Sequence, residues 1–147
     1  MKFNIIYGSK TGNSWKVAHR IGEALNCTKI SNAKDLLISC ANIGDVFIKN
    51  DINILIASTW GDGELQEDME RFLITPSELT DLKFMIIELG NYYGYDDFSF
   101  GAGKIMANIV NAKGGEVIDM ISVDSLPIID WETVHIWLSY WEANEFK

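Results

Sequence analysis

The sequence is poor in proline and cysteine and has no long hydrophobic run. It contains 2 prolines among 147 residues and no linker-like or low-complexity stretch, which excludes a largely disordered chain. No apolar run approaches the roughly 18 residues that a transmembrane helix requires, and no secretory signal segment opens the sequence. We therefore expect one folded domain, residues 1–147, in the cytoplasm and without membrane insertion.

Potential metal ligands and basic residues are also scarce. Cys27 and Cys40 are too far apart for a redox C-x-x-C pair and too few for a zinc cluster. Neither His19 nor His135 has metal-ligand spacing. Lys and Arg total 12 against 21 Asp and Glu, so the formal net charge is −9. A field of this sign repels nucleic acid and anionic membranes and favours basic protein partners.

Short apolar runs rich in Ile and Val indicate buried parallel strands. The runs are Phe3–Tyr7, Ile52–Ala57, Phe84–Leu89 and Val117–Val123, with a weaker one at Cys27–Ile30. Other segments have apolar residues at helical spacing: Val17, Ala18, Ile21 and Leu25; Met69, Phe72 and Leu73; Ile105, Met106, Ile109 and Val110; Trp131, Val134, Leu138 and Trp141. This alternation predicts an α/β fold, a single doubly wound, five-stranded parallel sheet with helices on both faces.

The ends of two helices carry clear signals. Asp130 can cap the last helix through its carboxylate, and Gly114 and Gly115 end the preceding helix. We expect the tryptophans of the last helix, including Trp137, to pack against the sheet. Ligands of doubly wound sheets bind beyond the carboxyl ends of the strands, so functional residues are expected in the loops that follow.

The loop after the first predicted strand has the composition of a phosphate site. Amides in the first turn of a helix attract anions, glycine lets the backbone approach closely, and hydroxyl groups can donate hydrogen bonds. The candidate ligands are Ser9, Lys10, Thr11, Gly12, Asn13 and Ser14. The spacing matches neither a nucleoside triphosphate loop nor a dinucleotide fingerprint, so a monophosphate is favoured. A polar, hydroxyl-capped turn is the alternative explanation of this loop by itself.

Aromatic residues follow two further strands at the same end of the sheet. Trp60 lies in the stretch Ser58–Asp62, and Tyr92, Tyr93 and Tyr95 follow Gly90. An indole and a phenol on these loops can sandwich a flat ring, each adding about 0.5 to 1.5 kcal/mol beyond area burial. A single loop aromatic would more often serve packing. Here, however, the phosphate loop and both aromatic loops lie at the same end of the sheet, which favours one common binding site.

Taken together, the loops Ser9–Ser14, Ser58–Asp62 and Gly90–Phe98 resemble those of the flavodoxin family, over nearly the whole chain. Flavodoxin is itself the standard example of strand order 2-1-3-4-5 with FMN between strands one and three, so this order is taken from the family. The resemblance implies noncovalently bound FMN. The last predicted strand, Val117–Val123, is followed within a few residues by Leu126, Pro127 and the last helix, without the insertion that marks long-chain members. The chain therefore resembles the short-chain class.

The resemblance also implies roles for individual residues. Trp60 and Tyr95 would cover the two faces of the isoalloxazine ring, and the peptide of Gly61 would turn to meet N5 in the semiquinone. The remaining ring-binding positions are Ser58, Thr59, Leu89, Gly90, Asn91 and Tyr92. Asn91 stands where many members carry Asp, and Tyr92 and Tyr93 are bulkier than usual there.

The implied function is that of a low-potential one-electron carrier, monomeric and not an enzyme, which cycles between semiquinone and hydroquinone. Implied partners are an NADPH-dependent flavodoxin or ferredoxin reductase and, in a photosynthetic setting, photosystem I, or other terminal oxidoreductases. Acidic residues could form a docking rim for their basic faces or simply a solvated surface: Asp62, Glu64, Glu67, Asp68, Glu70, Asp96 and Asp97.

Three other functions belong to the same fold class. An FMN-dependent quinone or nitro reductase would share the fold, but the sequence carries no pyridine-nucleotide motif. A flavodoxin-like accessory protein that serves one dedicated enzyme is a second alternative. A phosphoryl-receiver domain is disfavoured because Ser9 and Lys10, and Ser58 and Thr59, stand where acidic residues would be required.

Overall fold

A parallel sheet forms the centre of the molecule. The computed structural model describes residues 1–9, 12–39, 43–60, 63–75, 77–90, 101–125 and 128–145. Its parallel strands are β1 (Phe3–Gly8), β2 (Cys27–Asn32), β3 (Ile52–Trp60), β5 (Lys83–Gly90) and β6 (Glu116–Asp124). They lie in the order β2-β1-β3-β5-β6, which is 2-1-3-4-5 when these five are counted along the chain. The predicted fold class and strand order are therefore confirmed.

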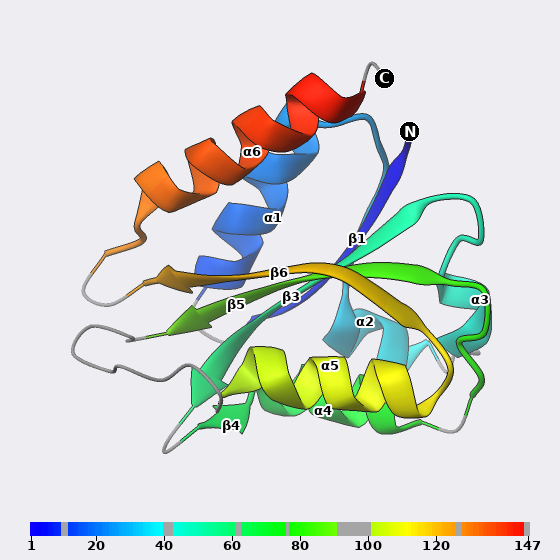
Figure 1. Cartoon of the computed structure of the whole chain (residues 1–147). Helices are drawn as coiled ribbons and strands as arrows, with labels where there is room; N and C mark the ends of the chain where they lie inside the picture. The colour runs from blue at the N-terminus through cyan, green and yellow to red at the C-terminus, as the bar shows by residue number, and fades with distance from the viewer. Residues whose placement is uncertain are drawn as a thin grey trace.

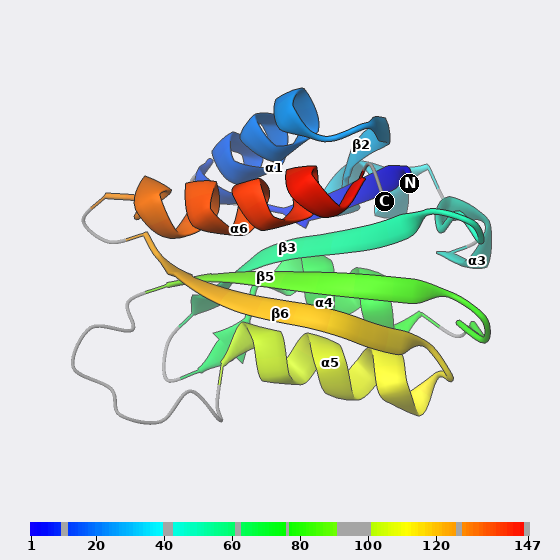
Figure 2. The ribbon, with the colours of Figure 1, turned by 45° about the horizontal axis from the view of Figure 1, so that its top comes forward.

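Helices cover both faces of this sheet (Figure 1). On one face lie α1 (Asn13–Ala24) and α6 (Trp131–Glu145), and on the other lie α2 (Ala33–Ile38), α4 (Glu67–Ile74) and α5 (Ala102–Ala112). A short helix, α3 (Ile43–Val46), precedes β3. Figure 2 shows α1 and α6 side by side above the sheet, with α4 and α5 below it. Among the residues that the structure describes, no helix is long and apolar enough to cross a membrane.

Two hydrophobic cores flank the sheet because successive side chains of a strand point to opposite faces. Ile54 and Ile56 of β3 pack with α1 and α6. Leu55 and Ala57 of the same strand pack with α4 and α5. This two-sided burial explains why the strands read as continuous apolar runs rather than as alternating patterns.

The third strand is longer than predicted. It continues past Ala57 to Trp60 because a two-residue strand, β4 (Glu64–Leu65), pairs antiparallel with its end. Thr59 lies opposite Leu65, and Trp60 lies opposite Glu64. Ser58 and Thr59 therefore belong to the strand, although their polar side chains are typical of a loop.

The last helix is attached as predicted. Asp130 Oδ2 accepts a hydrogen bond from Thr133 Oγ1 at 2.7 Å, and Oδ1 accepts one from the Thr133 amide at 3.3 Å. Trp137 is buried, and Trp131 and Trp141 are partly buried against the same core. The expected packing of these tryptophans is confirmed.

Asp130 should make a small, acid-sensitive contribution to stability. The hydroxyl and the amide of Thr133 hold the pKa of Asp130 below its usual range. Because the folded pKa is the lower one, the contribution is present above the unfolded pKa of about 3.9 and is lost as pH falls through the folded value. The carboxylate is largely solvated, so we expect a loss under about 1 kcal/mol. Urea midpoints between pH 5 and pH 2 should fall less in Asp130→Asn than in the parent chain, and parallel curves would contradict this assignment.

Candidate functional site

The carboxyl ends of the parallel strands gather at one edge of the sheet. Figure 1 shows that α1, α5 and α6 all begin at this edge. Of the predicted ligands, the structure describes Ser9, Gly12, Asn13, Ser14, Ser58, Thr59, Trp60, Leu89 and Gly90. The predicted ligands Lys10, Thr11, Gly61, Asn91, Tyr92 and Tyr95 lie outside the described residues. The described ones come together from β1, α1, β3 and β5, as the sequence predicts for a site beyond the strand ends.

The loop that is predicted to bind phosphate leads into the N-terminus of α1, which no side chain of the N-cap residue caps. Ser9 Oγ accepts a hydrogen bond from the Gly12 amide at 2.8 Å, which draws the two ends of the loop together. Gly12 is the N-cap of α1 and has no side chain to accept from the first-turn amides. Its φ of 94° is left-handed, and a Cβ placed there would meet no atom within 4 Å. Among the described residues, no side chain of the N-cap pairs with the first-turn amides of α1, and the space beside Gly12 is open, which suits an anion.

Gly8, the residue before this loop, makes a close backbone approach. A Cβ at Gly8 would overlap with Gln66 Oε1 and lie 3.0 Å from Met69 Cβ. Gln66 is 1% exposed, and its Oε1 caps α4 by accepting from the Met69 amide at 3.0 Å. Its Nε2 donates to Asp68 Oδ2 at 3.1 Å. The end of β1 therefore packs directly against Gln66, the residue that joins β4 to α4.

The first turn of α1 is also tied to the ends of β3 and β6. Ser14 is fully buried, and its Oγ lies 3.4 Å from Ser58 Oγ. Asn13 Nδ2 donates to the Ser125 carbonyl at 3.5 Å. The amide of Ser125 in turn donates to the Gly90 carbonyl at 2.8 Å. Ser125 was not predicted, although it follows the last strand at the same sheet edge and could have been found by that rule.

Trp60 presents an aromatic surface at the end of β3. The residue is 37% exposed, and its carbonyl accepts from the Gly63 amide at 3.2 Å in the turn that leads to β4. A hollow of about 180 Å³ is lined by Trp60, Glu64, Leu65, Gln66 and Glu67. An exposed indole at the same sheet edge as the start of α1 can contact a flat ring.

The end of β5 contributes mainly backbone. Leu89 is fully buried, and the Gly90 carbonyl is already used by Ser125. Thr59 of the neighbouring strand accepts a hydrogen bond at Oγ1 from the Ala102 amide at 3.0 Å, which draws the start of α5 to this edge. Hydrogen bonds within the protein therefore already connect the ends of these strands and the start of α5.

Two acidic side chains, Glu64 and Glu67, line the hollow beside Trp60, and further acidic residues lie nearby in the sequence. Glu64, Glu67 and Glu70 are exposed and Asp68 is half-buried, whereas Asp62, Asp96 and Asp97 lie outside the described residues. Glu67, Asp68 and Glu70 occupy the first turn of α4, where the helix dipole stabilises negative charge. Their position thus has a structural reason that does not depend on docking.

The donors at this edge fit a phosphate monoester joined to a planar ring. Among the described residues they are backbone amides and serine hydroxyls, which suit an anion better than a cation, and the exposed indole of Trp60 offers a flat surface for a ring. Within the described ranges, no group of three or more His, Cys, Asp or Glu side chains could hold a metal ion.

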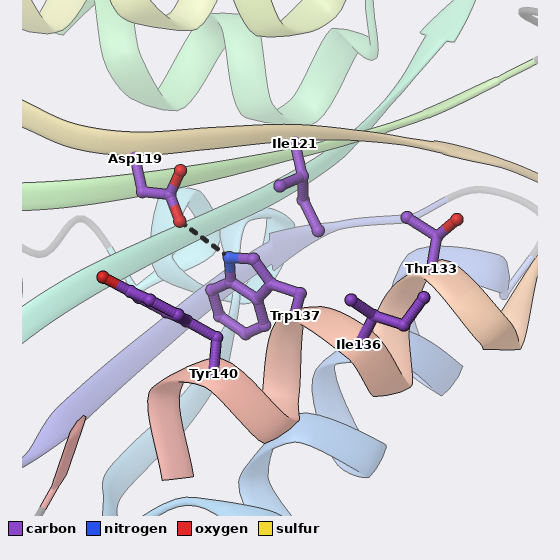
Figure 3. A pocket seen from close by; sticks show the side chains of 6 residues that line it. All are labelled: Asp119, Ile121, Thr133, Ile136, Trp137 and Tyr140. Carbon is purple, nitrogen blue, oxygen red and sulfur yellow. Dashed lines mark hydrogen bonds between the residues drawn. The ribbon is translucent and has the colours of Figure 1, made fainter. Parts of the chain in front are cut away.

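A second hollow lies apart from this edge, between β6 and α6 (Figure 3). Its volume is about 300 Å³, and it is lined by Asp119, Ile121, Thr133, Ile136, Trp137 and Tyr140. Asp119 Oδ2 accepts hydrogen bonds from two indoles, Trp137 Nε1 at 2.9 Å and Trp141 Nε1 at 3.1 Å. This carboxylate therefore fastens α6 to the edge strand of the sheet.

Comparisons with known proteins agree with the fold. The family model described as flavodoxin matches residues 5–134. Protein MioC homolog from Pasteurella multocida is 30% identical over 142 residues, or 93% of each chain. Flavodoxin from Synechocystis is 29% identical over 119 residues, which are 80% of this chain and 68% of its own. A crystal structure of Fusobacterium nucleatum flavodoxin bound to flavin mononucleotide superposes with a TM-score of 0.72 at 16% identity, covering 97% of this chain and 95% of that one.

Proposed function

Because the chain belongs to the flavodoxin family, we propose that it is a low-potential one-electron carrier that holds one FMN noncovalently. Bound FMN would supply a centre that accepts and releases single electrons between its half-reduced and fully reduced forms. One observation carries the proposal: the uncapped start of α1 and the exposed face of Trp60 meet at the same sheet edge. The uninterrupted β6, Glu116–Asp124, agrees with the short-chain class.

The chain's own residues would divide the work of binding. Amides and hydroxyls of the first loop would hold the phosphate, and the α1 dipole would offset its charge. The proposed phosphate ligands are Ser9, Lys10, Thr11, Gly12, Asn13 and Ser14. Trp60 and Tyr95 would exclude water from the two ring faces. The proposed contacts around the ring edge are Ser58, Thr59, Gly61, Leu89, Gly90, Asn91 and Tyr92.

The proposed partners are redox proteins with basic docking faces. An NADPH-dependent flavodoxin or ferredoxin reductase would donate electrons, and photosystem I or another terminal oxidoreductase would accept them. The exposed Glu64 and Glu67 beside Trp60 and the exposed Glu70 in the first turn of α4 support this surface, together with the net charge of −9. We propose a cytoplasmic monomer that folds as one domain over residues 1–147 and that has no enzymatic activity of its own.

A second candidate function rests on the near full-length match to the MioC homologue, which carries a name other than flavodoxin. The chain would then be a flavodoxin-like accessory protein for one dedicated enzyme. Electron delivery to several unrelated acceptors would favour the general carrier, whereas delivery to a single acceptor would favour the accessory role.

The test is anaerobic stepwise reduction of the purified protein, followed by visible absorbance. A carrier should be yellow and should pass through a stable one-electron stage before it bleaches. It should also leave NADPH unoxidised until a flavodoxin reductase is added. Bleaching in a single two-electron step, with NADPH oxidation by the protein alone, would instead favour a quinone or nitro reductase, and a protein without affinity for FMN would reject the site.

Replacing Trp60 by alanine should weaken FMN binding about tenfold, or about 1.4 kcal/mol, because one ring-stacking surface is lost. Quenching of flavin fluorescence during titration of the apoprotein measures the dissociation constant. Tyr140→Ala is a suitable control because Tyr140 is 59% exposed on α6, away from the site. Equal affinities of the two variants would remove Trp60 from the proposed site.

A further inference from the structure

Glu88 is a buried carboxylate in the middle of an apolar strand. It lies in β5 between Ile87 and Leu89 and is 1% exposed. Burial of a carboxylate is costly unless hydrogen bonds satisfy its oxygens. The proposed function gives this group no role so far.

Both oxygens of Glu88 are satisfied by donors from other elements. Oε2 accepts from the Gly103 amide at 2.5 Å, and Oε1 accepts from Ser122 Oγ at 2.5 Å. Gly103 lies in the first turn of α5, where the helix dipole stabilises an anion. Ser122 lies in β6. One side chain therefore joins β5, β6 and the start of α5.

The start of α5 is shaped to receive this carboxylate. A Cβ at Gly103 would lie 2.8 Å from both Cδ and Oε2 of Glu88. A Cβ at Gly101 would lie 3.2 Å from Glu88 Oε2 and 3.2 Å from Thr59 Oγ1, and the φ of Gly101 is 116°. With a side chain at either position, α5 could not approach the sheet so closely.

Glu88 lies close to the residues that flank the proposed ring-binding loops. Gly90 and Gly101 bound the segment 91–100, which carries Asn91, Tyr92 and Tyr95. Gly90 is two residues after Glu88 in β5, and Gly101 packs against the Glu88 side chain. Thr59, which accepts from the Ala102 amide, directly precedes Trp60. Thr59 and Gly101, which flank the two proposed ring-binding loops, therefore both lie at the start of α5, which Glu88 holds through the Gly103 amide.

We propose that Glu88 is a positioning residue for the FMN site. By holding the start of α5 and β6 against β5, it sets the position of Gly101, the first described residue after the segment 91–100. Its buried carboxylate would also disfavour negative charge on a ring bound at this edge of the sheet, which would make the carrier more strongly reducing. This inference rests on the proposed function, since it concerns the same site.

The first test is the charge-neutral variant Glu88→Gln, which retains an oxygen to accept from the Gly103 amide. The midpoint potential of the second electron should rise by about 59 mV, which corresponds to a tenfold change in the reduction equilibrium. Asp51→Asn is a matched control: Asp51 is 7% exposed and accepts from Thr28 Oγ1 at 2.7 Å, but it lies at the opposite edge of the sheet. This control should leave the potential unchanged, and equal shifts in the two variants would overturn the proposal.

The second test probes position and keeps the charge. Ser122→Ala removes the donor to Oε1, so the dissociation constant of FMN should rise about threefold. This test does not depend on whether Glu88→Gln folds. If Ser122→Ala lowers the urea midpoint but leaves the FMN dissociation constant unchanged, the hydrogen bond serves stability alone, and the positioning role is overturned. If the parent chain binds FMN and takes up single electrons, only this inference is at stake. A parent chain that does not bind FMN would reject the proposed function as well.

Discussion

Replacing Asp119 by alanine should lower the free energy of unfolding by about 3 kcal/mol. A single oxygen of this carboxylate accepts from the indoles of Trp137 and Trp141, at 2.9 and 3.1 Å. Its removal leaves two N–H donors without their acceptor, and Trp137 is only 7% exposed. A buried donor without a partner costs about 1 to 3 kcal/mol. Urea unfolding followed by tryptophan fluorescence and circular dichroism measures the loss.

Two companion variants separate the hydrogen bonds from the charge. Asp119→Asn retains an oxygen that can accept, so its loss should be about 1 kcal/mol. Glu116→Ala removes an exposed carboxylate from the same strand and should change stability by less than about 0.5 kcal/mol. If Asp119→Ala costs no more than Glu116→Ala, water replaces the carboxylate at both indoles and the attachment of α6 has another cause.

Replacing Gly8 by alanine should cost about 2 to 3 kcal/mol, because the added Cβ overlaps with Gln66 Oε1. Gln66 cannot move without giving up its hydrogen bond to the Met69 amide, the cap of α4. Since Gly8 leads directly into Ser9, FMN affinity should fall together with stability. Chemical denaturation and flavin titration of the same samples measure both effects.

A double-mutant cycle with Gln66→Ala identifies the cause. If the overlap with Gln66 dominates, Gly8→Ala should cost at least about 1 kcal/mol less in the Gln66→Ala background than in the parent chain. Strictly additive losses would mean that the strain comes from Met69 Cβ, 3.0 Å from the added carbon, or from the backbone.

The strands of this fold were predictable because the sheet is covered on both faces. The central strands β1, β3 and β5 then need consecutive apolar residues, whereas the edge strand β2 is only partly buried and has the weaker run. All five runs are confirmed within strands β1, β2, β3, β5 and β6. Helices α2 and α3 have six and four residues, too short for a helical period to stand out. Asn32 was nevertheless a readable signal for α2, since its side chain accepts from the Lys34 amide at 2.9 Å.

The candidate site could be proposed from the sequence only where its chemistry lies in consecutive residues. The loop from Ser9 to Ser14 and the exposed Trp60 could be read from spacing and residue type. The contacts of Gln66, Glu88 and Ser125 join residues far apart in the chain, so they depend on tertiary packing. Glu88 did leave one sign, because a lone carboxylate within an apolar run must find partners once the strand is buried.

The close fit of Glu88 against the start of α5 has an evolutionary consequence. Glu88, Gly101 and Gly103 occupy one shared volume, so a change at one of them alters what the other two positions can tolerate. Lineages that acquire a side chain at position 103 should first have shortened the residue at position 88. Substitutions at the three positions should therefore be correlated among relatives, and they should occur in a restricted order.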